Sequence, residues 1–277
     1  MTDAPFTVTH DGAVATLTLS RPDKRNAMSM DFWRDLPAAI EEIDRSGETR
    51  AIVIASTGPH FTAGLDLAAF ASVQREGLGA AAPLDFLHTV DLMQRAFTAL
   101  EAARVPVICS VQGGCIGGGV DMVTAADIRL CTEDAYFSVY EVVIGMTADV
   151  GTFPRLLNHL PEGLVRELAY TGRKMHADEA LRHGLVNRVL PDQAACDAAA
   201  AEIAAEIARH APLAVHGAKR AITYARDHTT QDTLDWIGVW NASMLQRSEL
   251  MAAMAAKQSG QPGEFAPLPP KRGLGDA

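Results

Sequence analysis

The sequence has few cysteines, few aromatic residues and no long apolar run. Its 277 residues include 4 cysteines, and no two of them have the C-x-x-C spacing of a typical zinc site. We therefore expect free thiols in a reducing compartment and no bound metal. No segment reaches the roughly 18 consecutive apolar residues that a membrane-spanning helix requires, so we expect no membrane partner.

Positive charge is also scarce. Lys and Arg total 24 while Asp and Glu total 34, which gives a formal net charge of -10. Such a balance argues against a protein that wraps the phosphates of a nucleic acid, although it permits one small basic pocket. Residues 1–5 are acidic and lack the basic and apolar segments of a secretory signal, so we expect a cytoplasmic location.

The hydrophobic periodicity predicts an α/β fold. Residues 6–19 alternate with a period of two around Asp11-Gly12, which indicates two strands, and further short apolar runs indicate buried strands. Residues with helical spacing separate these strands, as in sheets with a parallel component. The expected strands are 51–55, 105–111, 128–131, 135–139 and 186–190, and the expected helices are 30–44 and 85–103.

After Pro191 the composition becomes rich in alanine, and residues 198–210, 212–227 and 230–256 are expected to be helical. The Gly- and Pro-rich end of the chain is typical of a flexible segment. We therefore expect an α/β core at 1–200, a helical region at 201–258 and a flexible tail at 259–277.

A glycine-rich segment, Gly113–Asp121, follows an expected strand and opens an expected helix. Glycine lets a ligand approach backbone N–H groups closely, and the first N–H groups of a helix lack intrahelical partners. The segment is neither a P-loop nor a G-x-G-x-x-G motif. It therefore indicates a site for a negatively charged oxygen, or else only close packing of a helix on a strand. A second loop, Phe61–Leu67, could expose amides around Ala63 and Gly64.

Three acids stand near these loops in the sequence. Asp121 lies about one helical turn past Gly118, and Glu141 and Asp149 each have mainly apolar neighbours. A buried carboxyl group has a raised pKa and can exchange protons with a substrate. Each of the three could instead be a helix cap or a surface acid.

Together, the 61–67 loop, the 114–121 segment and Glu141 resemble the crotonase superfamily, also called the enoyl-CoA hydratase/isomerase family. The resemblance covers nearly the whole chain. Within the family, 113–121, 148–152 and 173–180 are most similar to Δ3,5-Δ2,4-dienoyl-CoA isomerases. A hydratase of this family would have Glu at position 121 and a small residue near 149, where this chain has two aspartates.

The resemblance implies a crotonase-like spiral of ββα units with a C-terminal helical region that forms a homotrimer or hexamer. It implies conversion of 3,5-dienoyl-CoA to 2,4-dienoyl-CoA, with CoA as part of the substrate and no other cofactor. Glu141 and Asp149 would transfer protons, with Asp121 as a third acid. The backbone N–H groups of Ala63 and Gly118 would form the oxyanion hole. The implied substrate-binding residues are Ala63, Gly64, Leu65, Asp66, Leu67 and Lys24.

Two alternatives remain open at this point. One is another enzyme of the same fold, either an enoyl-CoA hydratase or a Δ3-Δ2-enoyl-CoA isomerase, and the other is an acyl-CoA binder without activity. Tyr140 and Met146 also depart from the usual residues of dienoyl-CoA isomerases. The length of the preferred acyl chain is therefore left open.

Overall fold

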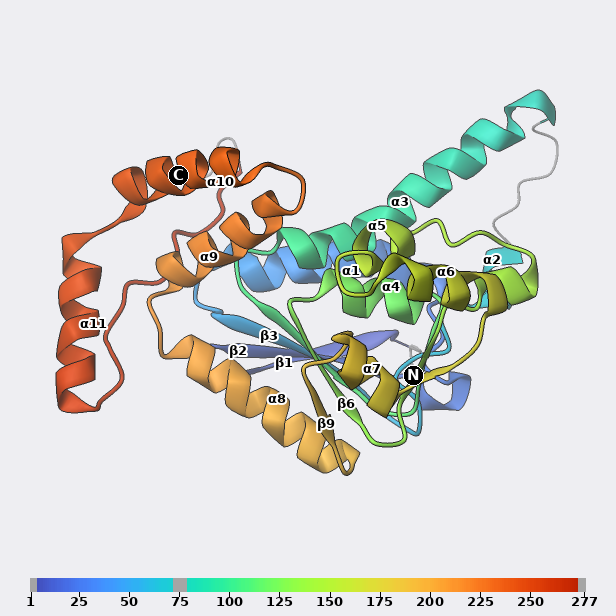
Figure 1. The fold of residues 1–277 in the computed structure, drawn as a ribbon, viewed down its shortest axis with the longest axis horizontal. Coiled ribbons are helices and arrows are strands. Elements are labelled where there is room, and N and C mark those ends of the chain that lie inside the picture. The colour runs from blue at the N-terminus through green and yellow to red at the C-terminus, as the bar shows by residue number, and fades with distance from the viewer. Residues whose placement is uncertain (1–3, 72–78, 274–277) are drawn as a thin grey trace.

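The computed structural model describes residues 4–71 and 79–273. A six-stranded sheet in the order β1-β2-β3-β4-β6-β9 forms the centre (Figure 1). A second sheet has three strands in the order β5-β7-β8. The larger sheet contains β1 (Phe6–Asp11), β2 (Val14–Leu19), β3 (Ala51–Ser56), β4 (Val107–Val111), β6 (Ile128–Thr132) and β9 (Arg188–Leu190). The smaller sheet contains β5 (Gly114–Ile116), β7 (Tyr136–Ser138) and β8 (Met175–His176).

Helices follow most of the strands. From the N-terminus they are α1 (Met30–Arg45), α2 (Leu67–Ala71), α3 (Ala82–Ala102), α4 (Gly118–Ala125), α5 (Thr152–Leu156), α6 (Glu162–Thr171), α7 (Ala177–His183), α8 (Gln193–Ala208), α9 (Pro212–Ala225), α10 (Thr230–Met244) and α11 (Arg247–Ser259). Three short 3-10 helices, η1 (Pro22–Lys24), η2 (Gly79–Ala81) and η3 (Glu141–Ile144), complete the described elements.

The chain repeats one unit, a strand of the large sheet followed by a strand of the small sheet and then a helix. β4 leads to β5 and α4, and β6 leads to β7 and the helices after it. The segment after β3 follows the same pattern, because Thr62 in this segment forms a parallel bridge with Cys115 of β5 in the small sheet. This arrangement confirms the expected spiral of ββα units.

Helices cover both faces of the large sheet. Ile52 and Ile54 pack with the apolar face of α1, whereas Ala51 and Val53 pack with α8, because alternate residues of a strand point to opposite faces. α8 therefore belongs to the core. The expected domain boundary at residue 200 falls inside this helix, because a composition rich in alanine does not show whether a helix packs against the sheet.

The helices after α8, which are α9, α10 and α11, extend one after another away from the core (Figure 1). α9 is anchored by the buried Lys219, whose Nζ lies 2.9 Å from Asp127 Oδ2 and also donates to the carbonyls of Leu100 and Val105. The single helix expected at 230–256 is divided into α10 and α11, because Leu245 and Gln246 adopt extended backbone conformations. Neither α10 nor α11 has a buried residue.

The part of the expected flexible tail that the structure describes is packed against the body of the protein. Leu268 is only 3% exposed, and the Arg104 Nη1 atom donates to the Pro269 carbonyl at 2.6 Å. Lys271 forms an ion pair with the buried Asp44 at 2.7 Å. The described part of the tail is therefore held by long-range contacts, whereas the Gly- and Pro-rich composition suggested that it is free. Composition could not predict this, because it does not show which distant groups form hydrogen bonds or ion pairs with the tail.

All four thiols are free and buried, as expected for cysteines outside a disulfide or zinc framework. Burial raises the pKa of Cys109 and of Cys131 to about 12. Burial likewise raises the pKa of Cys115 and Cys196. The thiolate, which is the reactive form, is therefore strongly disfavoured at all four positions.

Candidate active site

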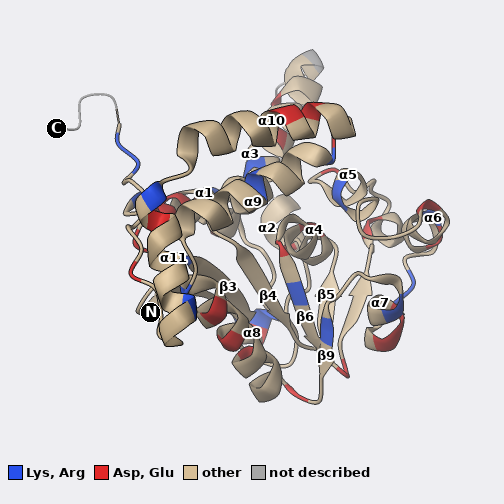
Figure 2. Ribbon diagram, turned by 60° about the vertical axis from the view of Figure 1, so that its left-hand side comes forward, with Lys and Arg blue, Asp and Glu red and all other residues tan. Residues whose placement is uncertain are grey.

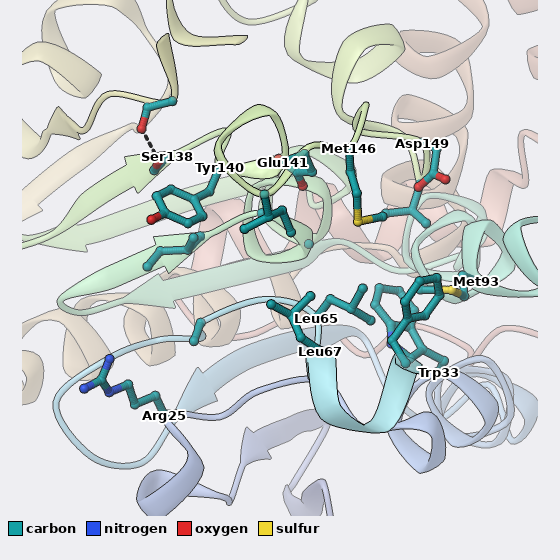
Figure 3. Close-up of a pocket in the computed structure, with 18 of the residues that line it drawn as sticks. Arg25, Trp33, Leu65, Leu67, Met93, Ser138, Tyr140, Glu141, Met146 and Asp149 are labelled. Atoms are coloured by element: carbon teal, nitrogen blue, oxygen red, sulfur yellow. Dashed lines mark hydrogen bonds between the residues drawn. The ribbon is translucent and has the colours of Figure 1, made fainter. Parts of the chain in front are cut away.

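A cavity of about 530 Å³ lies between the loop before α2, the beginning of α4 and the segment that contains η3 (Figure 3). Its wall is largely apolar, and Glu141 and Asp149 are the two carboxylic acids in it. A concave apolar site with a few convergent polar groups is typical of small-molecule binding. The apolar part of the wall is formed mainly by Trp33, Leu65, Leu67, Phe70, Val90, Met93, Ile116, Ile144, Met146 and Val150.

The loop at 62–66 is held by the loop at 25–28. The Ala63 N–H donates to the Arg25 carbonyl at 2.9 Å, and the Gly64 N–H donates to the Thr62 hydroxyl at 3.1 Å. The prediction of Ala63 as an oxyanion donor is therefore wrong, because its N–H group is already used within the fold. Ala63 does line the cavity, as expected of a substrate-binding residue.

Leu65 supplies the amide that Ala63 does not. Met28 forms a parallel bridge with Leu65, in which the Met28 N–H donates to the Gly64 carbonyl and the Asp66 N–H donates to the Met28 carbonyl. In such a bridge the N–H of Leu65 itself points away from the bridging partner. Among the residues that the structure describes, no hydrogen-bond acceptor is found for the Leu65 N–H.

The Gly118 amide lies close to the same loop. Gly118 is the first residue of α4, so its N–H has no partner within the helix, and none is found elsewhere in the described chain. Gly64 has a φ of +80°, and a Cβ there would lie 2.6 Å from the Ile116 carbonyl and 3.3 Å from the Gly118 nitrogen. Only glycine permits this close approach, which brings the amides of Leu65 and Gly118 together at the cavity.

Glu141 begins η3 and lies against the turn that precedes α4. A Cβ on Gly117 would lie 3.1 Å from Glu141 Oε1, so this carboxyl group is next to the Gly118 amide. Its Oε2 atom is buried and has no hydrogen-bond partner within the described chain. Burial raises the pKa of Glu141, and the charge of Asp149 raises it further. Glu141 is thus placed to exchange a proton close to the paired amides.

Asp149 is half-buried and lies farther along the cavity, on the other side of Met146 (Figure 3). Its backbone carbonyl accepts a 2.7 Å hydrogen bond from Gln94 Nε2 of α3, which fixes this segment against the helix. Burial raises the pKa of its carboxyl group. The structure therefore brings Glu141 and Asp149 to one cavity at different positions along it.

Asp121 does not face the cavity. It is 0% exposed on α4, and its Oδ1 atom accepts a 2.6 Å hydrogen bond from the Thr152 hydroxyl, whereas Oδ2 has no partner among the described residues. Burial raises the pKa of Asp121 to about 7, while the Thr152 hydrogen bond opposes this shift and Glu141 adds to it. Asp121 thus lies behind the site, and direct contact with a substrate is not part of its role.

This buried acid predicts a pH-dependent stability. Between its ordinary pKa of 3.8 and about 7, folded Asp121 keeps a proton that the unfolded chain has lost. Its contribution to stability therefore falls as the pH rises through this range. Asp121→Asn mimics the neutral acid, so we expect its stability relative to the native protein to increase by about 3 kcal/mol between about pH 5 and about pH 9.

Urea unfolding of both proteins across this range measures the effect. The exposed Asp91 on α3 gives a matched control, Asp91→Asn, which should show no such trend. A difference between Asp121→Asn and the native protein that stays constant with pH would contradict the raised pKa.

The three basic residues of the loop at 21–25 lie in different surroundings. Arg25 lines the cavity, Lys24 is exposed outside its lining, and the Arg21 guanidinium is turned inward, donating to the Ala27 carbonyl at 2.7 Å. Asp66 also lies outside the lining, since it accepts from the Ala69 N–H near the start of α2 and forms an ion pair with Arg21 at 3.5 Å. Lys24 and Asp66 are therefore not placed to contact a ligand in the cavity.

Two cationic residues of the lining were not predicted as site residues. Arg173 and Lys174 follow α6 and lie on the same cavity as Arg25. Arg173 forms a bidentate pair with Glu179 at 2.8 and 2.7 Å, and the Lys174 ammonium lies 4.0 Å from the centre of the Tyr136 ring. Their adjacency in the sequence was a possible signal, but only the fold places them beside a loop that is almost 150 residues earlier.

Figure 2 shows basic and acidic residues interspersed over the described chain, and the absence of nucleic-acid binding stays a prediction. Within residues 4–71 and 79–273, no group of three or more His, Cys, Asp or Glu side chains is arranged to hold a metal ion. That the chemistry needs no metal stays a prediction. None of the described helices is both long enough and apolar enough to span a membrane.

Comparison with known proteins agrees with this geometry. Residues 9–257 match the family model for enoyl-CoA hydratase/isomerase. A mitochondrial Δ(3,5)-Δ(2,4)-dienoyl-CoA isomerase of Rattus norvegicus is 44% identical, over 89% of this chain and 78% of that protein. A peroxisomal protein of the same name from Arabidopsis thaliana is 35% identical, over 93% of this chain and 94% of that protein.

The fold is likewise shared with solved structures. A crystal structure of an enoyl-CoA hydratase from Bacillus anthracis has a TM-score of 0.85 and 25% identity, and the match covers 94% of this chain and 98% of that one. The family model, the relatives and the shared fold thus agree over most of the chain. The chain belongs to the enoyl-CoA hydratase/isomerase family.

Proposed function

We propose that this protein isomerises 3,5-dienoyl-CoA thioesters to 2,4-dienoyl-CoA thioesters. One observation supports this most directly: two acids, Glu141 and Asp149, line one largely apolar cavity at different positions, and Glu141 lies next to the amides of Leu65 and Gly118, for which the described chain offers no acceptor. The relatives named dienoyl-CoA isomerases, at 44% and 35% identity, support the same activity.

The reaction moves a proton between two ends of a conjugated system. Glu141 lies next to the paired amides, which would hold the thioester oxygen, so it removes the proton from C2 as the C2–H bond breaks. The electron pair moves into the diene and the thioester oxygen gains negative charge, which the N–H groups of Leu65 and Gly118 stabilise. Asp149, farther along the cavity, gives its proton to C6, where the new C–H bond forms.

The position of Asp121 distinguishes this activity from hydration. A hydratase uses two carboxyl groups to hold one water beside the double bond, and the acid at position 121 would be one of them. Here Asp121 is buried behind the cavity and bound to Thr152, so it has no access to such a water. Isomerisation therefore fits the geometry better than hydration.

Three cations on the cavity wall suit an anionic CoA group. Arg25 and Lys174 come from two separate loops and offer donors for phosphate oxygens, and Arg173, whose guanidinium is held by Glu167 and Glu179, lies beside Lys174. The proposed assembly is a homotrimer or hexamer, supported by apolar side chains that α10 and α11 expose, among them Val239 at 68% and Met251 at 55%.

The proposed location is the cytoplasm, although the two relatives carry mitochondrial and peroxisomal names.

A turnover screen tests the proposal. The purified protein is given 3,5-dienoyl-CoA, 3-enoyl-CoA and 2-enoyl-CoA, and the absorbance of the conjugated product is followed. We expect the dienoyl substrate to have the highest kcat/KM. Preferred loss of the 2-enoyl substrate would identify a hydratase, preferred conversion of the 3-enoyl substrate a Δ3-Δ2 isomerase, and binding without any turnover an inactive acyl-CoA binder.

A further inference from the structure

A second cavity of about 450 Å³ lies directly behind Asp149, between α3, α5 and the end of α9. Asp149 and Val150 line both this cavity and the acyl cavity, so together they form the wall between the two. The second cavity opens to solvent, because several of its lining residues are exposed. These exposed lining residues are Gln94, Thr98, Pro154, Asn158 and Asp227.

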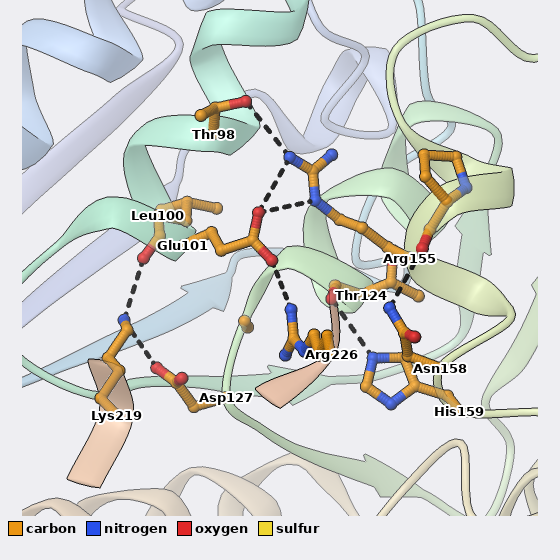
Figure 4. A network of polar contacts seen from close by, with 12 residues as sticks. Thr98, Leu100, Glu101, Thr124, Asp127, Arg155, Asn158, His159, Lys219 and Arg226 are labelled. Atoms are coloured by element: carbon orange, nitrogen blue, oxygen red, sulfur yellow. Dashed lines mark hydrogen bonds and ion pairs between the residues drawn. The ribbon is translucent and has the colours of Figure 1, made fainter. Parts of the chain in front are cut away.

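The wall of the second cavity is polar and ordered. Arg155 donates to Glu101 at 3.3 Å and to the Thr98 hydroxyl at 3.2 Å, and Arg226 pairs with the other oxygen of Glu101 (Figure 4). This network links α3, α5 and the end of α9. A cavity of this size with polar groups in its wall has room for water molecules, whereas the wall of the acyl cavity is largely apolar.

The proposed reaction leaves the two acids in exchanged protonation states. Before turnover Glu141 is ionised and Asp149 carries a proton, and afterwards Glu141 carries the proton from C2 and Asp149 is ionised. A second turnover in the same direction requires Glu141 to lose its proton and Asp149 to gain one. A proton source for Asp149 that does not pass through the occupied acyl cavity would complete the cycle.

We propose that the polar cavity behind Asp149 is a water-filled path through which this acid regains its proton from solvent after each turnover. This inference rests on the proposed isomerase function. It follows from the position of Asp149 in the wall shared by an apolar, substrate-sized cavity and a polar cavity open to solvent. The neighbouring charged groups Glu101, Arg155, Arg226 and Asp227 line the second cavity and are not part of the wall of the acyl cavity.

Filling the cavity tests this path. Thr223→Trp and Asn158→Trp each place an indole at its lining from a different helix or turn, without changing Asp149 or the Glu101 network. Leu157→Trp is the matched control, because Leu157 is the exposed neighbour of Asn158 and lines a different surface pocket. Crystal structures of the variants establish that the indoles occupy the cavity.

Two measurements are made on each protein with 3,5-dienoyl-CoA. Single-turnover rates report the chemical step, and steady-state kcat in addition reports the return of the enzyme to its starting state. In the filled variants we expect unchanged single-turnover rates and a kcat that is about tenfold lower. In D2O, the native enzyme should place solvent deuterium at C6, whereas the filled variants should transfer more of the original C2 hydrogen to C6.

The outcomes separate this inference from the proposed function. If the filled variants keep the native kcat and the native deuterium content at C6, Asp149 regains its proton by another route, such as internal return from Glu141 by way of Asp121. If the native protein shows no single-turnover isomerisation at all, the proposed function itself is wrong. The Leu157→Trp control should behave as the native enzyme in both measurements.

Discussion

Replacing Asp149 by asparagine is expected to lower kcat for 3,5-dienoyl-CoA isomerisation by about 10²- to 10⁴-fold, the usual contribution of a positioned proton-transfer group. Asparagine has nearly the same size and shape but cannot give a proton to carbon. Asp149 faces the acyl cavity and its backbone carbonyl, which holds the Gln94 amide, is unaffected by the change. The fold should therefore be retained while the far end of the diene loses its acid.

Hydrogen exchange gives a sharper test of this assignment than the rate alone. In Asp149→Asn, Glu141 is still beside the paired amides, so exchange of the C2 hydrogen with D2O should continue while deuterium no longer enters C6. Glu141→Gln should abolish the C2 exchange. Asp91→Asn, an exposed carboxyl change on α3, is the control and should retain native activity. Unchanged dienoyl turnover in Asp149→Asn would show that another group protonates C6.

The second large effect is expected from removing the amide of residue 65. Leu65→Pro eliminates the N–H that, together with that of Gly118, stabilises the negative thioester oxygen. Loss of one such donor typically lowers kcat by about 10²- to 10³-fold. The bridge to Met28 uses the Gly64 carbonyl and the Asp66 N–H, so it does not depend on the amide that proline removes.

Leu65→Ala controls for the side chain, because it shortens a residue of the cavity wall but keeps the N–H group. Its kcat should stay within about tenfold of the native value. Thermal unfolding of both variants shows whether proline has disturbed the loop. A folded Leu65→Pro protein with native kcat would show that another amide of the loop, and not that of residue 65, stabilises the negative thioester oxygen.

The fold was predictable because its signals are local. Alternation within β2, the apolar spacing of α1 with Phe32, Leu36 and Ile40, and the short apolar runs of the parallel strands are each contained in a few residues. The boundary at 200 and the free tail were not predictable in this way. α8 and Leu268 are buried by contacts with segments far away in the sequence, which composition does not reveal.

The site was predictable only in part, for a similar reason. Glu141 and Asp149 were identified through apolar neighbours and family resemblance, and both face the cavity. The choice between the amides of Ala63 and Leu65 depends on hydrogen bonds to residues 25 and 28, almost 40 positions earlier. Nothing within the 61–67 segment distinguishes them. The withdrawal of Asp121 from the cavity likewise depends on its bond to Thr152.

Because all four cysteine thiols are buried in the folded protein, their reaction with a thiol reagent reports on opening of the structure. A thiol reagent in solution meets no accessible thiolate while the chain is folded, and Cys115, in the small sheet beside the 62–66 loop, is fully enclosed. Alkylation therefore measures how often the core becomes exposed. Comparison of labelling at Cys115 with labelling at Cys196, a buried residue of α8, distinguishes local opening near the substrate from release of that helix on the opposite face of the sheet.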